Sequence, residues 1–211
     1  MLIKITNPLI AHYVGKMRDK ETGSKDFGQV IKNLVYLMAG EVFKDFEAHE
    51  KVVTTPICDT TILELSDKIC LIPVMRAGLS MLQPMQDILP DSTCGFLGMK
   101  RKYAGPDNAV AELYYSNLPK NLPDYNVYLL EVVMASGATL VPAIQHLTEL
   151  GVKPQNINII SFIASDVSIG KVEKIDKDIK VFACEIDHLR ESDGYLVPGL
   201  GDAGDRYCNH D

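Results

Sequence analysis

The sequence feature that most constrains the fold is a set of short segments that are apolar at nearly every residue. These segments are Ile69–Met75, Thr93–Met99, Asn126–Val133, Asn158–Ile163 and Lys180–Cys184. A strand without polar alternation is buried on both faces, and such strands belong to mainly parallel sheets that helices cover on each side. The sequence therefore predicts an α/β fold with a mainly parallel sheet flanked by helices.

Helical spacing of apolar residues appears between these segments and before them. Leu79–Leu89 and Leu140–Leu150 each follow a predicted strand, and Gly151 marks the end of the second helix. Lys25–Phe46 has the pattern of an amphipathic helix with one face on a core. In an open parallel sheet, ligands bind beyond the carboxyl ends of the strands, so the residues that follow each strand are the candidates for a site.

The composition of the chain limits the kinds of molecule that it is expected to bind. The 211 residues carry a net charge of −7, which argues against nucleic acid because its phosphate backbone needs clustered Lys and Arg. No segment has the apolar length of a signal core or a membrane span. The five cysteines are scattered without metal-ligand spacing, which indicates reduced thiols in the cytoplasm. Because no repeat or linker interrupts the chain, we expect a single domain over residues 1–211.

The segment Val127–Thr139 carries a predicted strand into a loop of small residues, and a helix begins directly after it. Backbone N–H groups in such a loop, together with a helix N-terminus, form a cradle for a phosphate group. Glu131 interrupts the apolar strand, and its carboxylate can accept hydrogen bonds from both hydroxyls of a ribose. Neither the P-loop nor the Rossmann glycine motif is present. Taken alone, the segment fits a capped helix after a buried strand equally well.

Two further segments have the composition of loops or hairpins. Gly194–Asp205 reads GYLVPGLGDAGD, and its glycines and proline exclude a helix or a central strand. It is therefore expected to be an ordered loop whose backbone approaches another group closely. Between Lys100 and Pro123, Gly, Pro and Asn accompany alternating apolar residues, which predicts a projecting hairpin.

Together these motifs resemble those of one family. The acidic residue, small-residue loop and helix at 131–139 are similar to the phosphoribosyl pyrophosphate (PRPP) motif of the type I phosphoribosyltransferases. The GYLVPGLGDAGD string resembles the base-recognition signature of the uracil phosphoribosyltransferases within that family. Pro73–Leu79 (PVMRAGL) and Met99–Arg101 (MKR) are similar to the two segments whose arginines meet pyrophosphate. The resemblance covers essentially the whole chain.

The resemblance implies transfer of ribose 5-phosphate from PRPP to uracil, giving UMP and pyrophosphate in pyrimidine salvage. It implies the type I phosphoribosyltransferase fold, with a flexible β-hairpin flap at about 100–123 and a C-terminal base-recognition hood at about 185–205. Catalysis would rest on Asp202, Arg76 and Arg101. The residues that would contact PRPP are Arg76, Arg101, Glu131, Met134, Ala135, Ser136, Gly137, Ala138, Thr139 and Asp202. Those that would contact uracil are Leu196, Gly201, Asp202 and Ala203.

The resemblance also implies Mg²⁺ bound mainly through PRPP rather than by protein side chains, and a homo-oligomer, either a dimer or a tetramer. It leaves activation by GTP open. Two alternatives stay open as well: a phosphoribosyltransferase-like regulatory or low-activity protein, and a relative that uses another base. The chain departs from the family pattern at Glu131–Val132, where Asp-Pro is usual, and at Ala138 and Ser80, where glycine is usual. The departures at Glu131 and Ala138 bear on PRPP binding.

Overall fold

The computed structural model describes residues 1–103 and 109–209, without the side chains of residues 101–103 and 109–110. The strands of its main sheet are, in spatial order, β1 (Leu2–Lys4), β11 (Lys180–Leu189), β10 (Ile157–Ser165), β8 (Asn126–Leu130), β4 (Ile69–Met75), β6 (Phe96–Tyr103) and β7 (Ala109–Asn117). Every neighbouring pair in this order is parallel except β6 with β7. Short strands β5 (Thr93–Cys94), β9 (Val133–Met134) and β12 (Leu196–Val197) join the sheet beside β4, β10 and β11. The predicted mainly parallel sheet is confirmed.

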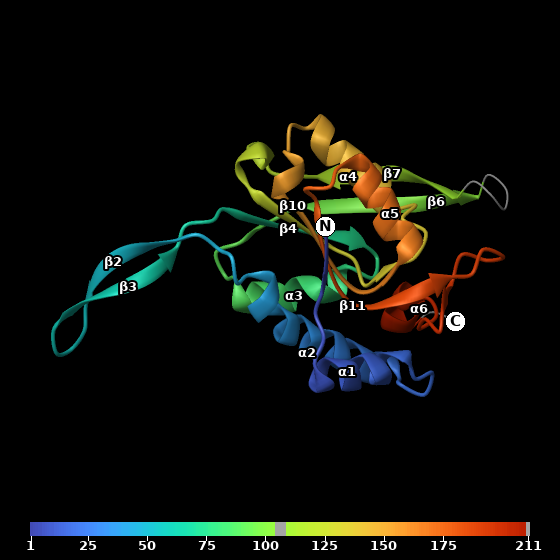
Figure 1. Cartoon of the computed structure of the whole chain (residues 1–211), viewed down its shortest axis with the longest axis horizontal. Coiled ribbons are helices and arrows are strands. Elements are labelled where there is room, and N and C mark those ends of the chain that lie inside the picture. The colour runs from blue at the N-terminus through green and yellow to red at the C-terminus, as the bar shows by residue number, and fades with distance from the viewer. Residues whose placement is uncertain (104–108, 210–211) are drawn as a thin grey trace.

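Helices cover both faces of this sheet (Figure 1). On one face lie α1 (Pro8–Arg18), α2 (Ser24–Val42) and α3 (Leu79–Ile88), and on the other lie α4 (Leu140–Glu149) and α5 (Asp166–Ile175). Short helical turns lie at Leu122–Asp124 (η1) and Pro154–Asn156 (η2), and α6 (Ala203–Cys208) ends the described chain. All nine residues of β10 are buried, as expected for a central strand covered on both faces.

Some predicted boundaries are wrong, and each difference has a local cause. The helix predicted over 25–46 ends at Val42, because Phe43 and Phe46 leave the helix and pack their rings against Tyr128. The strand predicted over 126–133 divides into β8 and β9. Between them the N–H of Glu131 still bonds to β10, but the regular pairing is interrupted. The strand predicted over 93–99 likewise divides into β5 and β6.

Two hairpins extend from the sheet (Figure 1). The antiparallel pair β6 and β7 confirms the hairpin expected after Lys100. Residues 104–108, the centre of the expected flexible flap, lie outside the described residues. The second hairpin, β2 (Ala48–Thr54) with β3 (Asp59–Leu65), forms a separate sheet that projects from the body. Our sequence analysis assigns no element there, because both strands are largely exposed and lack the apolar runs of core strands.

Candidate active site

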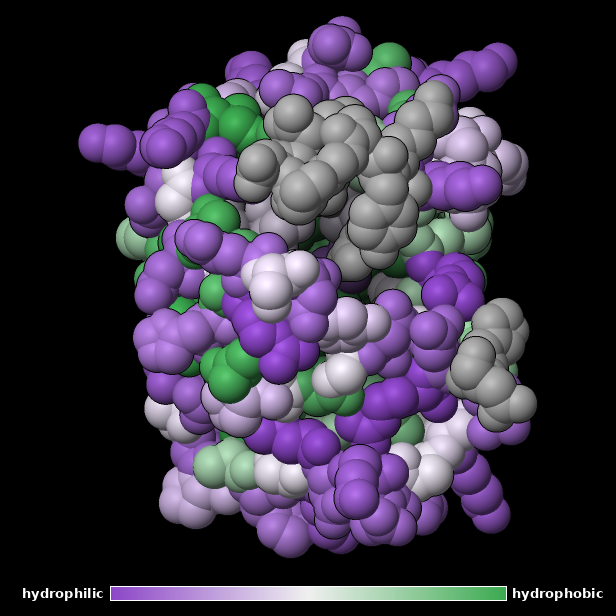
Figure 2. All heavy atoms as spheres, turned by 90° about the vertical axis from the view of Figure 1, so that its right-hand side faces the viewer, coloured by the Kyte–Doolittle hydropathy of each residue, from purple (hydrophilic) through white to green (hydrophobic). Residues whose placement is uncertain are grey.

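A pocket of about 470 Å³ opens at the carboxyl ends of β4 and β8. The expected substrate-binding residues that line it are Arg76, Glu131, Ala135, Thr139, Leu196, Gly201, Asp202 and Ala203. They come from three segments that are far apart in the sequence and meet at one edge of the sheet. Figure 2 looks onto this end of the molecule, where the visible surface is mostly hydrophilic and its hydrophobic patches are small and separate. Such a surface suits a polar substrate.

Hydrogen bonds to α5 and to the residue before it hold the small-residue loop that follows β9. Two side chains of this helix and that of its N-cap residue donate hydrogen bonds to three successive carbonyl groups of the loop. The pairs are Ser168 Oγ with Met134 O (2.9 Å), Ser165 Oγ with Ala135 O, and Lys171 Nζ with Ser136 O (2.8 Å). Because a planar trans peptide carries its N–H opposite its C=O, the following N–H groups are directed to the other side of the loop. This is the arrangement that a phosphate cradle requires.

Gly137 lies in the middle of this loop with φ +73°, a conformation that favours glycine because a Cβ is strained there. The N–H of Ala138 donates to Ser136 Oγ at 3.3 Å. Met134 was expected to contact PRPP, but its side chain is 1% exposed and packs in the core. Met134 therefore supports the loop from the core and does not line the pocket, and the same lining omits Ser136, Gly137 and Ala138.

Glu131 reaches the pocket from the interruption between β8 and β9. The residue is 9% exposed, and Thr139 Oγ1 lies 3.5 Å from its Oε2 as a hydrogen-bond donor. Thr139 directly precedes α4, so this contact joins the end of a strand to the start of the helix that follows the loop. The acidic side chain is thereby held at the pocket wall.

Arg76 also lines the pocket and lies directly after β4, and its peptide bond with Met75 is cis. Its Nη2 donates to Asp205 Oδ1 at 2.8 Å, and the Arg76 side chain is 49% exposed. This hydrogen bond raises the pKa of Arg76 above its ordinary value, so the guanidinium stays cationic. The pocket thus brings one fixed positive charge next to acidic groups of the C-terminal segment.

The expected base-recognition residues adjoin Arg76. Asp202 begins α6 and accepts a hydrogen bond from the N–H of Asp205 at 3.0 Å, so it acts as the helix N-cap. A Cβ at Gly204 would lie 3.2 Å from Asp202 Oδ1 and 3.4 Å from Arg76 Nη2. The absence of a side chain at this glycine lets the base-recognition segment and the arginine lie close together.

Several pocket residues were not predicted from the sequence. Met99, Lys100 and Tyr195 also line the pocket. Lys100 adds an exposed cation within β6, and its position beside Arg101 in the MKR segment could have indicated it. Arg101 itself is paired with Ala111 through the β6–β7 hairpin, but its side chain lies outside the described part of the chain.

Among the described residues, no group of three or more His, Cys, Asp or Glu side chains is arranged to hold a metal ion. No described helix is long and apolar enough to cross a membrane. The five cysteines are free thiols.

The parallel sheet, the braced small-residue loop and the pocket at the strand ends define a type I phosphoribosyltransferase. An adenine phosphoribosyltransferase of Trypanosoma brucei shares this fold, with a TM-score of 0.57 at 10% identity over 88% of this chain and 83% of its own. The AQ2163 protein of Aquifex aeolicus is far more similar, with a TM-score of 0.89 and 31% identity over 98% and 97% of the two chains.

Sequence comparison narrows the class further. A family model described as uracil phosphoribosyltransferase matches residues 4–209. A uracil phosphoribosyltransferase of Campylobacter fetus is 37% identical over 97% of this chain and 96% of its own length. That of Clostridium kluyveri is 36% identical over 96% and 95%. The chain belongs to the uracil phosphoribosyltransferase family, as the sequence motifs predict.

Proposed function

We propose that this chain transfers the phosphoribosyl group of PRPP to uracil, forming UMP and pyrophosphate in pyrimidine salvage. The observation that carries the proposal is the family match over residues 4–209. The pocket supports it, because a cation, a carboxylate and a small-residue loop face one cavity of about 470 Å³. A cavity of this size suits a small-molecule ligand.

The base binds against the C-terminal segment. Backbone groups of Gly201 and Ala203 pair with the N3–H and O4 of uracil, and Leu196, 7% exposed, forms an apolar wall. Cytosine presents the opposite donor and acceptor at these two positions. It would leave buried backbone groups unpaired, which is a strong means of rejection.

The sugar and its phosphate bind at the loop after β8. Glu131 accepts hydrogen bonds from the ribose hydroxyls, and the 5-phosphate occupies the cradle of N–H groups over 135–139. This cradle consists of Ala135, Ser136, Gly137, Ala138 and Thr139, and the buried Met134 supports it from the core. The hydrogen bonds from Ser168 and Lys171 of α5 to carbonyl groups of the loop support the assignment. They fix the loop in a conformation whose N–H groups can bind an anion.

Arg76 and Arg101 bind the pyrophosphate, and Lys100 adds a third positive charge. As the C1′–O bond to pyrophosphate breaks, N1 of uracil approaches from the opposite face, and negative charge builds on the leaving group. Preorganised cations stabilise that charge more in the transition state than in the ground state. Asp202 lies nearest the junction of base and ribose and orients both. No nucleophilic side chain is needed.

Mg²⁺ is the implied cofactor, and its preference for oxygen ligands fits the carboxylates of Glu131 and Asp202 at the pocket wall. We expect the pyrophosphate and ribose oxygens of PRPP to supply most of its ligands. When bound, Mg²⁺ neutralises charge on the leaving group. Activation by GTP and a location in the cytoplasm stay predictions.

The proposed reaction is tested by incubating the purified chain with PRPP, uracil and Mg²⁺ and following UMP by chromatography. We expect UMP and pyrophosphate in equal amounts, and no product from Asp202→Ala. PRPP binding without any UMP would contradict the reaction and favour a regulatory protein that retains the fold.

We further propose that the chain forms a homo-oligomer through the β2–β3 hairpin. Val52, Leu63 and Leu65 are 68%, 74% and 55% exposed, and the strand register places all three on one face of the hairpin. The other face carries the ion pairs of Glu64 with Lys51 and His49. An isolated two-stranded hairpin is marginally stable in water, so its apolar face needs a partner surface, which a second copy supplies.

Sedimentation of the wild type and of Leu63→Lys tests this assembly. We expect the wild type to sediment as a dimer or tetramer and Leu63→Lys as a monomer. The matched control is Thr60→Lys, which adds the same charge at an exposed position on the other face of the hairpin, opposite Val53. A monomeric wild type at micromolar concentration would contradict the proposal.

A further inference from the structure

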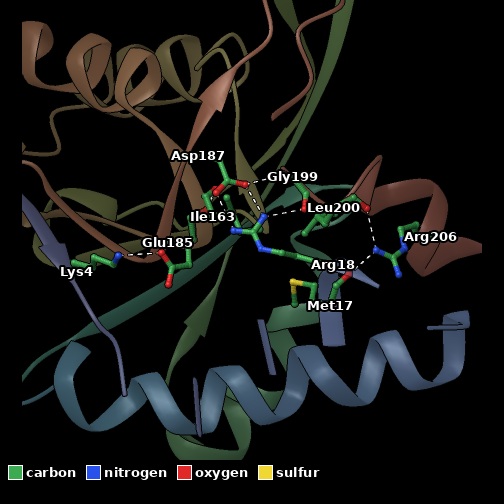
Figure 3. Close-up of polar contacts among 10 residues, drawn as sticks. Lys4, Met17, Arg18, Ile163, Glu185, Asp187, Gly199, Leu200 and Arg206 are labelled. Atoms are coloured by element: carbon green, nitrogen blue, oxygen red, sulfur yellow. Dashed lines mark hydrogen bonds and ion pairs between the residues drawn. The ribbon is translucent and has the colours of Figure 1, made fainter. Parts of the chain in front are cut away.

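Two charged residues outside the pocket, one buried and one partly buried, form an ion pair that contacts the base-recognition loop (Figure 3). Asp187, near the end of β11, is 4% exposed, and Arg18 is the last residue of α1. The two terminal nitrogens of Arg18 donate to the two carboxylate oxygens of Asp187 at 2.6 and 2.8 Å. A bidentate pair of this kind fixes both groups in one relative orientation.

Both members of the pair also bind Gly199. Its N–H donates to Asp187 Oδ2 at 2.8 Å, and its carbonyl accepts from Arg18 Nη1 at 2.8 Å. Gly199 has φ +61°, and an added Cβ would lie 2.1 Å from the carbonyl oxygen of Leu196. The donor and the acceptor of a single glycine are thus both fixed, two residues before Gly201.

A third side chain continues this support. Arg206 Nη1 donates to the carbonyl of Leu200 at 2.9 Å, and its guanidinium lies 4.5 Å from the ring centroid of Phe27 (Figure 3 draws the first contact). The backbone at 199–200 is therefore bound by side chains of α1, β11 and α6. The backbone that leads into the base-binding residues therefore has a fixed position.

We propose that Arg18 and Asp187 are positioning residues for base specificity. They fix the position of the backbone groups at 201–203 that distinguish uracil from other bases. Neither Arg18 nor Asp187 lines the described pocket. The inference rests on the proposed binding of uracil at these residues. Discrimination by backbone groups requires that donors and acceptors stay in place, since a mobile loop can adapt to the reversed pattern of cytosine. The sugar–phosphate loop has its own support from α5, so a loosened Gly199 affects uracil binding more than PRPP binding.

The test uses Arg18→Lys, which keeps the charge but loses the fork of donors, and Asp187→Asn, which keeps the shape but loses the charge. We expect KM for uracil to rise at least fivefold in both variants, with KM for PRPP within twofold of the wild type. The ratio of kcat/KM for uracil over cytosine should fall by a similar factor. The control is Lys4→Met, which breaks the exposed 2.9 Å pair of Lys4 with Glu185 on β1 and β11 and should change neither KM.

Hydrogen exchange of the amides at 199–203 provides a second readout that does not depend on turnover. We expect faster exchange in both variants than in the wild type and in Lys4→Met. If a single variant fails to fold, Arg18→Met with Asp187→Leu removes both charges together, and the same measurements apply to it.

Unchanged KM for uracil with unchanged exchange would overturn the positioning role, and so would an equal rise in both KM values. A wild type that forms no UMP contradicts the proposed reaction instead. In that case the exchange rates alone decide whether the pair holds the loop.

Discussion

At the residue scale, Arg76 is the cation most directly placed to meet pyrophosphate. It is half exposed and paired with Asp205 at 2.8 Å, and exposed pairs of this kind add little to stability. We expect Arg76→Ala to fold normally and to bind PRPP at least tenfold more weakly, since a charge-assisted contact contributes about 1.5–3 kcal/mol. Isothermal titration measures the affinity.

The matched control is Arg190→Ala, which removes another exposed Arg–Asp pair, that with Asp193. It should leave PRPP affinity unchanged. Equal affinity for PRPP in Arg76→Ala and in the wild type would remove Arg76 from the pyrophosphate site.

Glu131 tests how the chain accommodates its departure from the family pattern. Its carboxylate is 9% exposed and within 3.5 Å of Thr139, so the longer side chain fits this loop as it stands. Glu131→Asp shortens the reach by one methylene and should weaken PRPP binding about threefold to tenfold, a loss of about 1 kcal/mol. Tighter binding in the variant, again by titration, would mean that Glu131 holds the loop away from its best geometry.

At the scale of elements, α5 is a support for the phosphate loop as well as a cover for the sheet. Lys171→Met removes the hydrogen bond to the carbonyl of Ser136 but keeps the apolar stem. We expect KM for PRPP to rise about fivefold, which corresponds to a loss of about 1 kcal/mol of binding free energy, and KM for uracil to stay unchanged. Lys174→Met, an exposed change on the same helix, should alter neither value. Equal KM values for PRPP in the two variants would contradict this support.

The elements also show where sequence reasoning succeeds. The runs at β4, β8 and β10 are apolar at most positions, and burial on both faces leaves few alternatives to a parallel sheet. The β2–β3 hairpin was not predicted because its exposed strands mix charged and apolar residues. No other described part of the chain covers these strands. The support of Gly199 by Arg18 escaped too, because 181 positions separate the two residues and only the tertiary structure brings them together. The loop at 131–139, by contrast, is local, and its sequence together with the other motifs of the chain indicated an anion site.

At the scale of the whole molecule, the two-sided cover of the sheet predicts which thiols can react. Burial raises the pKa of Cys70 and of Cys184 to about 12 each, so both stay protonated at pH 8, and the thiolate is the reactive form. We expect iodoacetamide to leave both unmodified in the folded protein and to label all five cysteines in guanidinium. Peptide mass spectrometry identifies the labelled sites. Label on Cys70 or Cys184 without denaturant would show that the sheet is open at that point.

The central claim is that one pocket joins PRPP to uracil and selects this base by fixed backbone groups. The most direct test is kcat/KM at saturating PRPP for uracil, cytosine, hypoxanthine and orotate. We predict that uracil exceeds each of the others by about three orders of magnitude or more, because a mismatched base leaves buried polar groups unpaired. A value for hypoxanthine, orotate or cytosine equal to that for uracil would contradict the account.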